Sequence, residues 1–244
     1  MKLQALKDRL KFIAKEKGLT SQEVWNQLAF ERFLARLAKS KHNDKFIFKG
    51  GLLLSQYIKI GRETVDLDFL MKNLSATEDA IKIAVTEIAR VDLGDFFKFD
   101  YESIEKLDQP HMEYDGFRVT LKMSFETMTD KVQVDIGVGD VVNPEEMDYQ
   151  TFDYKGAALF SDAIAIQVYP LETILAEKLE TILAEKLETI ASKGAINSRM
   201  KDYHDALLIV RSGDLPEGPE LKKAIELTFA NRRTPLKFPL VLPQ

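Results

Sequence analysis

The spacing of apolar residues predicts two helices at the start of the chain. Leucine and isoleucine recur at helical intervals over residues 2–17, and Gly18 supplies the expected end of that helix. Thr20 and Glu23 have the spacing of a capping box, which predicts a second helix reaching about Ser40. Both helices are expected to be amphipathic and to pack through their apolar faces.

The second helix is expected to bury five apolar side chains and to leave larger polar ones at its margin. Trp25, Arg32 and Arg36 are expected to cover the edge of the core, and the alternative is that they face a partner. The residues expected inside the core are Val24, Leu28, Phe33, Leu34 and Leu37.

The middle of the chain predicts a mixed α/β core. Short runs rich in Phe, Val, Ile and Tyr alternate with turn residues, which is typical of strands. A capping-box pattern from Ser75 to Glu78 predicts a helix to about Val91, and residues 51–60 predict a shorter one. The five or six expected strands come from residues 46–48, 64–71, 96–106, 116–127, 131–138 and 163–169.

After Pro170 the pattern becomes helical, and residues 171–191, 199–212 and 217–230 are the expected helices. The chain is therefore expected to have an α+β fold with two lobes, residues 1–169 and residues 170–244. Since no Gly/Ser-rich linker separates them, we expect the lobes to pack closely, with a cleft between them.

The helix after Pro170 contains a tandem repeat. The eight residues from Leu171 to Lys178 recur unchanged from Leu179 to Lys186. Eight residues advance a helix by about 12 Å and rotate it by roughly 80°. Lys178 and Lys186 are therefore not expected to enter one small site together from a straight helix.

Composition narrows the class of protein. The chain has no cysteine, which excludes disulfides, zinc-thiolate sites and a cysteine nucleophile. No apolar run is long enough to span a bilayer and the start does not read as a signal peptide, so a cytoplasmic protein without a membrane partner is expected. The net charge is −5, yet residues 1–49 carry +7, which is either a solvated helix surface or a footprint for RNA.

Two glycines and two aspartates define the stretch with the clearest chemistry. A short apolar strand runs into Gly50 and Gly51, and the next expected strand carries Asp66 and Asp68. Residues i and i+2 of a strand point to the same face, so the two carboxylates are expected side by side. Because like charges so close repel each other, the pattern predicts a cation between them.

Asp135 is the candidate for a third carboxylate. Its neighbours Val134 and Ile136 are apolar, which places it inside a strand, where an unpaired carboxylate is costly. Carboxylates together with substrate phosphates are the ligands typical of Mg²⁺. Glycines at a helix start let backbone N–H groups approach phosphate oxygens. The combined pattern favours Mg²⁺-dependent phosphoryl or nucleotidyl transfer.

The order of these motifs resembles the nucleotidyltransferase superfamily, and more narrowly the AbiEii/AbiGii family of toxins from abortive-infection and type IV toxin–antitoxin systems. The resemblance spans about residues 45 to 210 and implies a polymerase-β-like core with a mixed sheet. Four stretches carry it: Lys49-Gly50-Gly51, Arg62-x-Thr64-x-Asp66-Leu67-Asp68-Phe69, Tyr169-Pro170-Leu171-Glu172-Thr173 with the Ala-Glu-Lys that follows, and Arg199-Met200-Lys201-Asp202-Tyr203-His204-Asp205.

The resemblance implies roles for the matching residues. Asp66 and Asp68 would be catalytic metal ligands, Asp135 the third metal ligand, and Asp202 a catalytic ligand or base. Asp205 is expected to be an acid on the helix surface. Nucleotide binding would fall to Lys49, Gly50 and Gly51, with Gly51 standing where many polymerase-β-like enzymes have a serine. Arg62 and Thr64 would bind nucleotide or brace the acidic strand.

The family's lysine has two candidates because of the tandem repeat. Counted from Pro170, the catalytic lysine falls on Lys178, and counted back from Asp202, it falls on Lys186. We prefer Lys186, since it keeps the spacing between the two C-terminal motifs. The other copy is then expected to be a surface lysine.

The resemblance implies transfer of a nucleoside monophosphate from an NTP to RNA, with the 3′ end of tRNA as the favoured acceptor, and neutralisation by a cognate antitoxin. Two alternatives stay open. The same site would modify a protein or a small molecule, or the chain would be a non-catalytic module that binds nucleotide.

Overall fold

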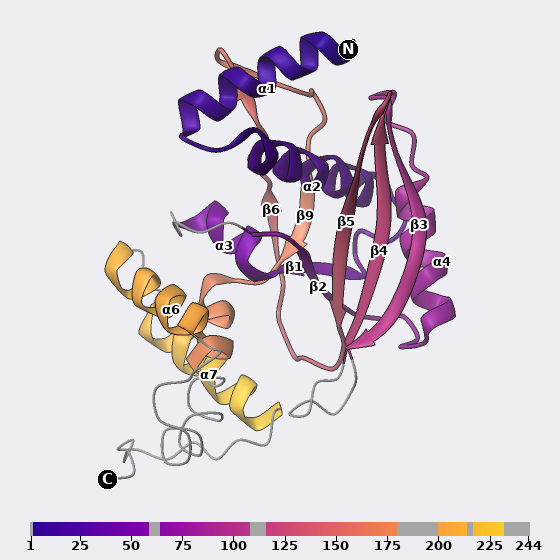
Figure 1. The fold of residues 1–244 in the computed structure, drawn as a ribbon. Helices are drawn as coiled ribbons and strands as arrows, with labels where there is room; N and C mark the ends of the chain where they lie inside the picture. The colour runs from indigo at the N-terminus through magenta and orange to yellow at the C-terminus, as the bar shows by residue number, and fades with distance from the viewer. Residues whose placement is uncertain (1, 59–63, 108–115, 180–199, 214–216, 232–244) are drawn as a thin grey trace.

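A seven-stranded mixed sheet forms the centre of the computed structural model, with helices packed around it (Figure 1). The structure describes residues 2–58, 64–107, 116–179, 200–213 and 217–231. The strands lie in the order β3-β4-β5-β2-β1-β9-β6. Their bounds are β1 Phe46–Lys49, β2 Leu67–Met71, β3 Phe97–Leu107, β4 Gly116–Phe125, β5 Met128–Gly137, β6 Glu145–Asp148 and β9 Ala165–Val168.

Helices precede, interrupt and follow the sheet, as the sequence predicts. A further pair of short strands, β7 (Asp153–Tyr154) and β8 (Ala157–Ala158), forms a separate hairpin. Residues 171–179 are helical as well. The helices with described bounds are α1 Leu3–Lys17, α2 Ser21–Lys39, α3 Gly50–Tyr57, α4 Glu78–Ala89, α6 Met200–Ser212 and α7 Gly218–Asn231.

Local signals set most helix ends. Gly18 ends α1 in the left-handed conformation, with φ of 67°. Thr20 and Glu23 form the predicted capping box, because each side chain accepts from the backbone N–H of the other residue. The capping box predicted from Ser75 is wrong: α4 is capped by Thr77, whose hydroxyl accepts from the N–H of Ala80.

The sheet is mixed because its central strands pair in both directions. β1 pairs antiparallel with β2, β2 pairs parallel with β5, and β1 pairs parallel with β9. The expectation of five or six strands misses β6, which pairs antiparallel with β9 at the sheet edge. Its sequence, Glu-Glu-Met-Asp, is mostly exposed and lacks the apolar alternation that identifies a strand.

The core joins the N-terminal helices to the sheet. Leu6, Leu10 and Ile13 of α1 are buried in the same cluster as the sheet's apolar side chains. The burial predicted for the apolar stripe of α2 is confirmed for all five of its members, Val24, Leu28, Phe33, Leu34 and Leu37.

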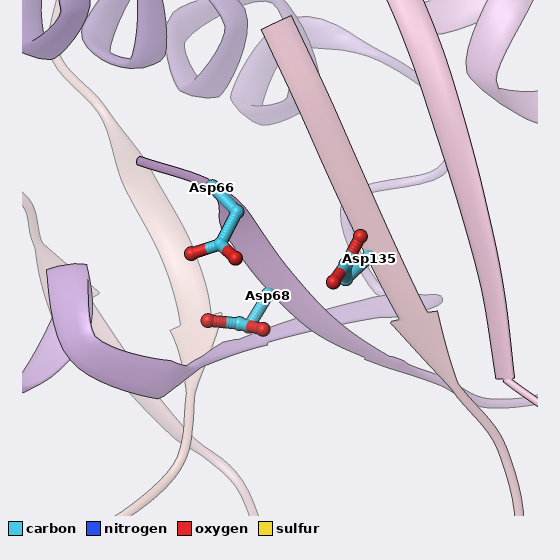
Figure 2. Close-up of side chains that lie close together, drawn as sticks. All are labelled: Asp66, Asp68 and Asp135. Carbon is cyan, nitrogen blue, oxygen red and sulfur yellow. The ribbon is translucent and has the colours of Figure 1, made fainter. Parts of the chain in front are cut away.

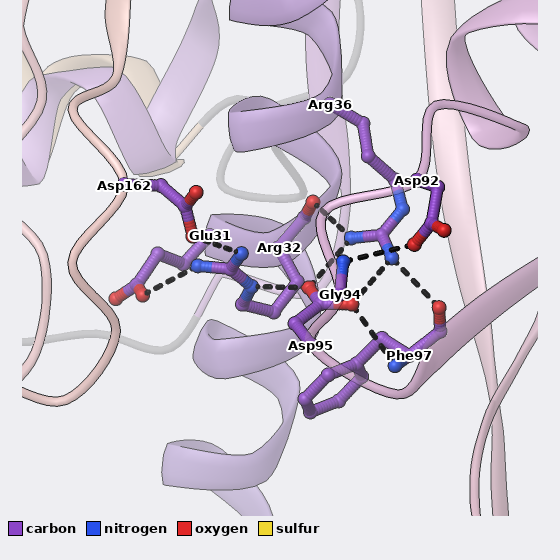
Figure 3. A network of polar contacts seen from close by, with 8 residues as sticks. All are labelled: Glu31, Arg32, Arg36, Asp92, Gly94, Asp95, Phe97 and Asp162. Carbon is purple, nitrogen blue, oxygen red and sulfur yellow. Dashed lines mark hydrogen bonds and ion pairs between the residues drawn. The ribbon is translucent and has the colours of Figure 1, made fainter.

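The positions predicted for Arg32 and Arg36 are wrong, because both side chains are fully buried. Figure 3 shows their guanidinium groups meeting Asp95, which lies just before β3. Arg36 Nη1 and Nη2 donate to the two Asp95 oxygens at 2.9 and 2.7 Å, and Arg32 Nε donates to Oδ2 at 2.8 Å. Arg32 also pairs with Asp162. Asp95 and Asp162 lie far from the two arginines in sequence, so no local sequence pattern predicts the network.

Candidate functional site

Asp66, Asp68 and Asp135 come together where β2 lies beside β5 (Figure 2). One carboxylate oxygen from each lies within 4.8 Å of the others, and among the described residues this is the cluster of acidic or histidine side chains with metal-binding geometry. Asp66 lies one residue before β2, Asp68 is the second residue of β2, and Asp135 lies opposite Asp68 in register. The predicted trio of acids is therefore brought together.

The three carboxylates form a strongly acidic site. Burial, followed by the charges of Asp66 and Asp135, raises the pKa of Asp68 to about 7. The charges of Lys49 and Lys178 act in the opposite direction. A cation among the three carboxylates would offset the repulsion between them. Because all the donor atoms are hard oxygens, the residues fit a Mg²⁺-type ion.

Gly50 brings the start of α3 against Asp68. Its φ is +82°, and a β-carbon at this position would overlap the Asp68 carboxylate. Both the conformation and the space therefore require glycine here. Because α3 begins at Gly50, its first backbone N–H groups lie next to the acidic site, where the helix dipole favours an anion.

The other residues predicted to bind nucleotide lie around this glycine. Gly51 is the second residue of α3, and Thr64 is buried shortly before β2. Arg62 lies outside the described residues.

Lys49 ends β1 and is directly opposite Asp68 in register. Its ammonium group lies 3.1 Å from Asp140 Oδ2 and 3.4 Å from Glu177 Oε2, and it also contacts the Tyr169 hydroxyl at 3.5 Å. Burial raises the pKa of Tyr169 well above its ordinary value, so the hydroxyl stays neutral. Lys49 thus joins β1 to the segment after β5 and to the helical residues 171–179.

Lys178 reaches the same region from the first copy of the repeat. Its ammonium group lies 3.0 Å from Asp205 Oδ2, and its charge lowers the pKa of Asp68. The Asp205 side chain is fully buried, so its prediction as a surface acid is wrong. Asp202 lies in α6, with its side chain outside the described part, and Lys186 lies outside the described residues altogether.

Arg118 is a site residue that the sequence did not reveal. It lies on β4 and forms a two-point ion pair with Asp135, which raises the pKa of the guanidinium through these hydrogen bonds. A single arginine in an alternating strand has no distinctive spacing. Only the register of β4 and β5, in which Arg118 and Asp135 are partners, places the two together.

Within the described ranges, the helices are too short or too polar to cross a bilayer.

Clustered carboxylates beside the start of a helix suit a site that binds phosphate groups together with a divalent cation. Residues 32–243 match the family described as nucleotidyl transferase AbiEii toxin, type IV toxin–antitoxin system. The chain belongs to this family, so it is a nucleotidyltransferase of the toxin class. The resemblance noted in the sequence is confirmed.

Solved structures from Helicobacter pylori are also similar. JHP933 is 14% identical, with 88% of this chain and 93% of that chain covered and a TM-score of 0.38. A candidate nucleotidyltransferase is 15% identical, with 88% and 96% covered and a TM-score of 0.37. No curated protein matches the chain.

Proposed function

We propose that this toxin is a Mg²⁺-dependent enzyme that transfers a nucleoside monophosphate from an NTP to RNA, with tRNA as the favoured acceptor. The acceptor hydroxyl loses its proton to a base as its oxygen bonds to the α-phosphorus, and the bond from the α-phosphorus to the bridging oxygen breaks to release pyrophosphate. The observation that carries the proposal is the acid trio beside Gly50, with ligand oxygens within 4.8 Å of one another. We further propose that a cognate antitoxin neutralises the enzyme and that it acts in the cytoplasm.

Asp66 and Asp68, with Asp135, would hold the metal ion. When bound, Mg²⁺ supplies charge compensation for the triphosphate and activates the attacking hydroxyl. Other groups of the chain would bind and orient the triphosphate. The first N–H groups of α3 would bind phosphate oxygens, and Gly50 keeps that helix start close to Asp68.

Lys178 is proposed as the lysine of the site. Its support is the contact with buried Asp205 and its influence on Asp68. A lysine held at this place would stabilise negative charge that develops on the phosphates. Asp205 would then act as the positioning residue for Lys178, and Asp202 remains a proposed ligand or base.

Lys49, at the end of β1, is proposed to contact a phosphate group of the nucleotide. Its ammonium group shares Asp140 and Glu177, so contact with a phosphate would weaken those two pairs. Thr64, Arg62 and Gly51 keep their proposed supporting roles in nucleotide binding.

We propose a division of the chain into residues 1–169 and 170–244. Two observations support it: the last strand, β9, ends at Val168, and the described residues from Leu171 onward are mostly helical. The pair Lys49–Glu177 would join the two lobes at the site, and the pair Lys178–Asp205 would hold residues 171–179 against α6 within the second lobe.

The test is label transfer from each of the four α-labelled NTPs with Mg²⁺ and total tRNA. Parallel reactions replace tRNA with cell protein or with small hydroxylated acceptors such as aminoglycosides. We expect label on tRNA with one preferred NTP, and none when Mg²⁺ is chelated.

Three results would overturn parts of the proposal. Label on protein or on a small molecule, with tRNA untouched, contradicts the RNA acceptor. NTP binding without turnover on any acceptor supports a non-catalytic module. Transfer that survives the combined change Asp66→Ala and Asp68→Ala contradicts the assigned site.

A further inference from the structure

Arg118 binds the third member of the acid trio through both of its oxygens. Nε donates to Asp135 Oδ1 at 2.7 Å, and Nη2 donates to Oδ2 at 2.6 Å. The two residues are register partners on adjacent antiparallel strands. This two-point geometry is the strong and orientation-fixing form of an arginine–carboxylate pair.

Arg118 also belongs to a row of charged residues that crosses five strands. Register pairs connect the members in turn, and directly paired residues share one face of a sheet. The two central acids therefore lie between two cations. The row, from β1 to β3, is Lys49, Asp68, Asp135, Arg118 and Glu105.

The two flanking cations are engaged differently. Lys49 contacts Asp140 and Glu177, which lie outside the trio. Arg118 contacts a trio carboxylate itself, and both side chains are only partly exposed, at 28% for Arg118 and 17% for Asp135. Screening by water is therefore incomplete, and the guanidinium charge interacts with two members of the trio, Asp135 and Asp66.

We propose that Arg118 is the counter-cation of Asp135 and sets how tightly the nucleotide-free site takes a divalent cation. The inference rests on the proposed function, which makes the acid trio a metal site. A guanidinium that occupies both Asp135 oxygens uses part of their capacity to accept ligands. It also repels an incoming cation. The site therefore takes the cation weakly until the triphosphate of an NTP adds its own oxygens.

The two possible roles of Arg118 give opposite results when it is removed. A residue that only braces Asp135 would weaken cation binding when it is lost. A counter-cation would strengthen it, since the site gains negative charge and Asp135 becomes available. The guanidinium and a bound divalent cation would lie a few ångströms apart in a partly exposed site. Their repulsion is expected to lower the affinity for the cation roughly tenfold.

The experiment is a Mn²⁺ titration of the nucleotide-free full chain, followed by the electron paramagnetic resonance signal of free Mn²⁺. Mn²⁺ favours the same oxygen ligands as Mg²⁺. Arg118→Met is expected to bind Mn²⁺ roughly tenfold more tightly than the unchanged chain. Lys122→Met removes an exposed cation from the same strand and is expected to change the affinity less than about threefold.

Two further variants make the test specific. Arg118→Lys keeps the charge but loses the two-point geometry, so its affinity should fall between those of the unchanged chain and Arg118→Met. It also serves as the test if Arg118→Met does not fold, as judged by circular dichroism. In an Asp135→Asn background, Arg118→Met should give a smaller gain than it gives with Asp135 present.

Unchanged or weaker Mn²⁺ binding in Arg118→Met would overturn the inference, and so would an equal gain in Lys122→Met. Failure of the proposed function is distinguishable. A chain that transfers no nucleotide, yet binds Mn²⁺ more tightly after Arg118→Met, supports the inference while contradicting the function. Transfer that depends on Asp68, combined with unchanged Mn²⁺ affinity in Arg118→Met, contradicts the inference alone.

Discussion

At the scale of single residues, Gly50 is the most constrained position of the site. Its φ of +82° is left-handed, and the Asp68 carboxylate occupies the space that a β-carbon at this position would need. Gly156 has nearly the same φ, +83°, but nothing lies within 4 Å of the position a β-carbon would take. The two glycines therefore separate the effect of backbone conformation from the effect of space.

Gly50→Ala is expected to destabilise the fold by roughly 2–5 kcal/mol, since strain and overlap add. Gly156→Ala is expected to cost about 1–2 kcal/mol, from strain alone. Urea unfolding measures both. Gly50→Ala should also abolish label transfer, whereas Gly156→Ala should keep it. Equal costs for the two changes would contradict the close approach of α3 to Asp68.

Glu31 gives a prediction about pH. Burial raises the pKa of this carboxyl from 4.5 to about 7, against the hydrogen bond that it accepts from the N–H of Phe152. The folded chain therefore holds a proton between about pH 4.5 and 7 that the unfolded chain has released. Stability from this group is present below that window and is lost as the pH rises through it.

Between pH 4.5 and 7.5, the unchanged chain should lose about 3 kcal/mol of stability relative to Glu31→Gln. Urea unfolding at both pH values gives the comparison. Glu16→Gln, at an exposed position on α1, is the control and should follow the unchanged chain. A constant difference between the unchanged chain and Glu31→Gln across this range would show that the carboxyl is ionised throughout.

At the scale of elements, Asp95 joins α2 to β3. It receives three hydrogen bonds from Arg32 and Arg36, and Arg36 also donates to the carbonyl of Phe97 (Figure 3). Burial would raise the pKa of Asp95, but the hydrogen bonds and charges of the two arginines hold it below its usual value. The network fixes how the helix crosses the sheet.

Asp95→Ala is expected to cost about 3–5 kcal/mol, because two buried guanidinium groups lose the carboxylate that they share. Asp92→Ala removes an exposed carboxylate three residues earlier, which accepts a hydrogen bond from the N–H of Gly94, and should cost less than about 1 kcal/mol. Thermal or urea unfolding measures both. Similar losses for the two variants would mean that the arginines are stabilised in another way.

The tandem repeat places one lysine in each copy, Lys178 and Lys186. Lys178→Met should lower the transfer rate by about 10²–10³-fold, the usual effect of losing one group that stabilises transition-state charge. Lys186→Met is the matched change in the second copy and should leave the rate within about threefold. Initial rates of label transfer decide between them. The reverse pattern would favour the lysine chosen from sequence spacing.

Elements were predictable from the sequence where local signals decide them. Gly18 and the Thr20–Glu23 pair set helix ends by local hydrogen bonds, and the aromatic and β-branched residues between turn residues identified β4 and β5. β6 was missed because edge pairing with β9 holds it without an apolar face. The burial of Arg32, Arg36 and Asp205 was missed because their partners come from distant segments.

At the scale of the whole molecule, the site depends on strand order. Asp66 and Asp68 were predictable as a pair from their spacing, and Asp135 from its apolar neighbours. Arg118 was not, since its role follows from the placement of β5 between β2 and β4. The row of charges across the sheet exists only once these registers are formed.

The molecule's segments meet at that row. β1, β2 and β5 contribute the acids and Lys49, the start of α3 contributes backbone N–H groups, and residues 171–179 contribute Glu177 and Lys178. The family match begins at residue 32, yet α1 and the start of α2 share the same core. The N-terminal helices are therefore integral to the fold that holds the site.

Nucleotidyl transfer at the acid trio is the activity that we propose for this chain. The most direct test compares initial rates of label transfer from the preferred α-labelled NTP for the unchanged chain, Asp68→Asn and Lys122→Met. Asp68→Asn keeps the shape of the side chain but removes a charge that the proposed metal ion would need. We predict a rate at least about 10³-fold lower for Asp68→Asn and a rate within about threefold for Lys122→Met. An Asp68→Asn variant that folds and transfers label at the unchanged rate would contradict the claim.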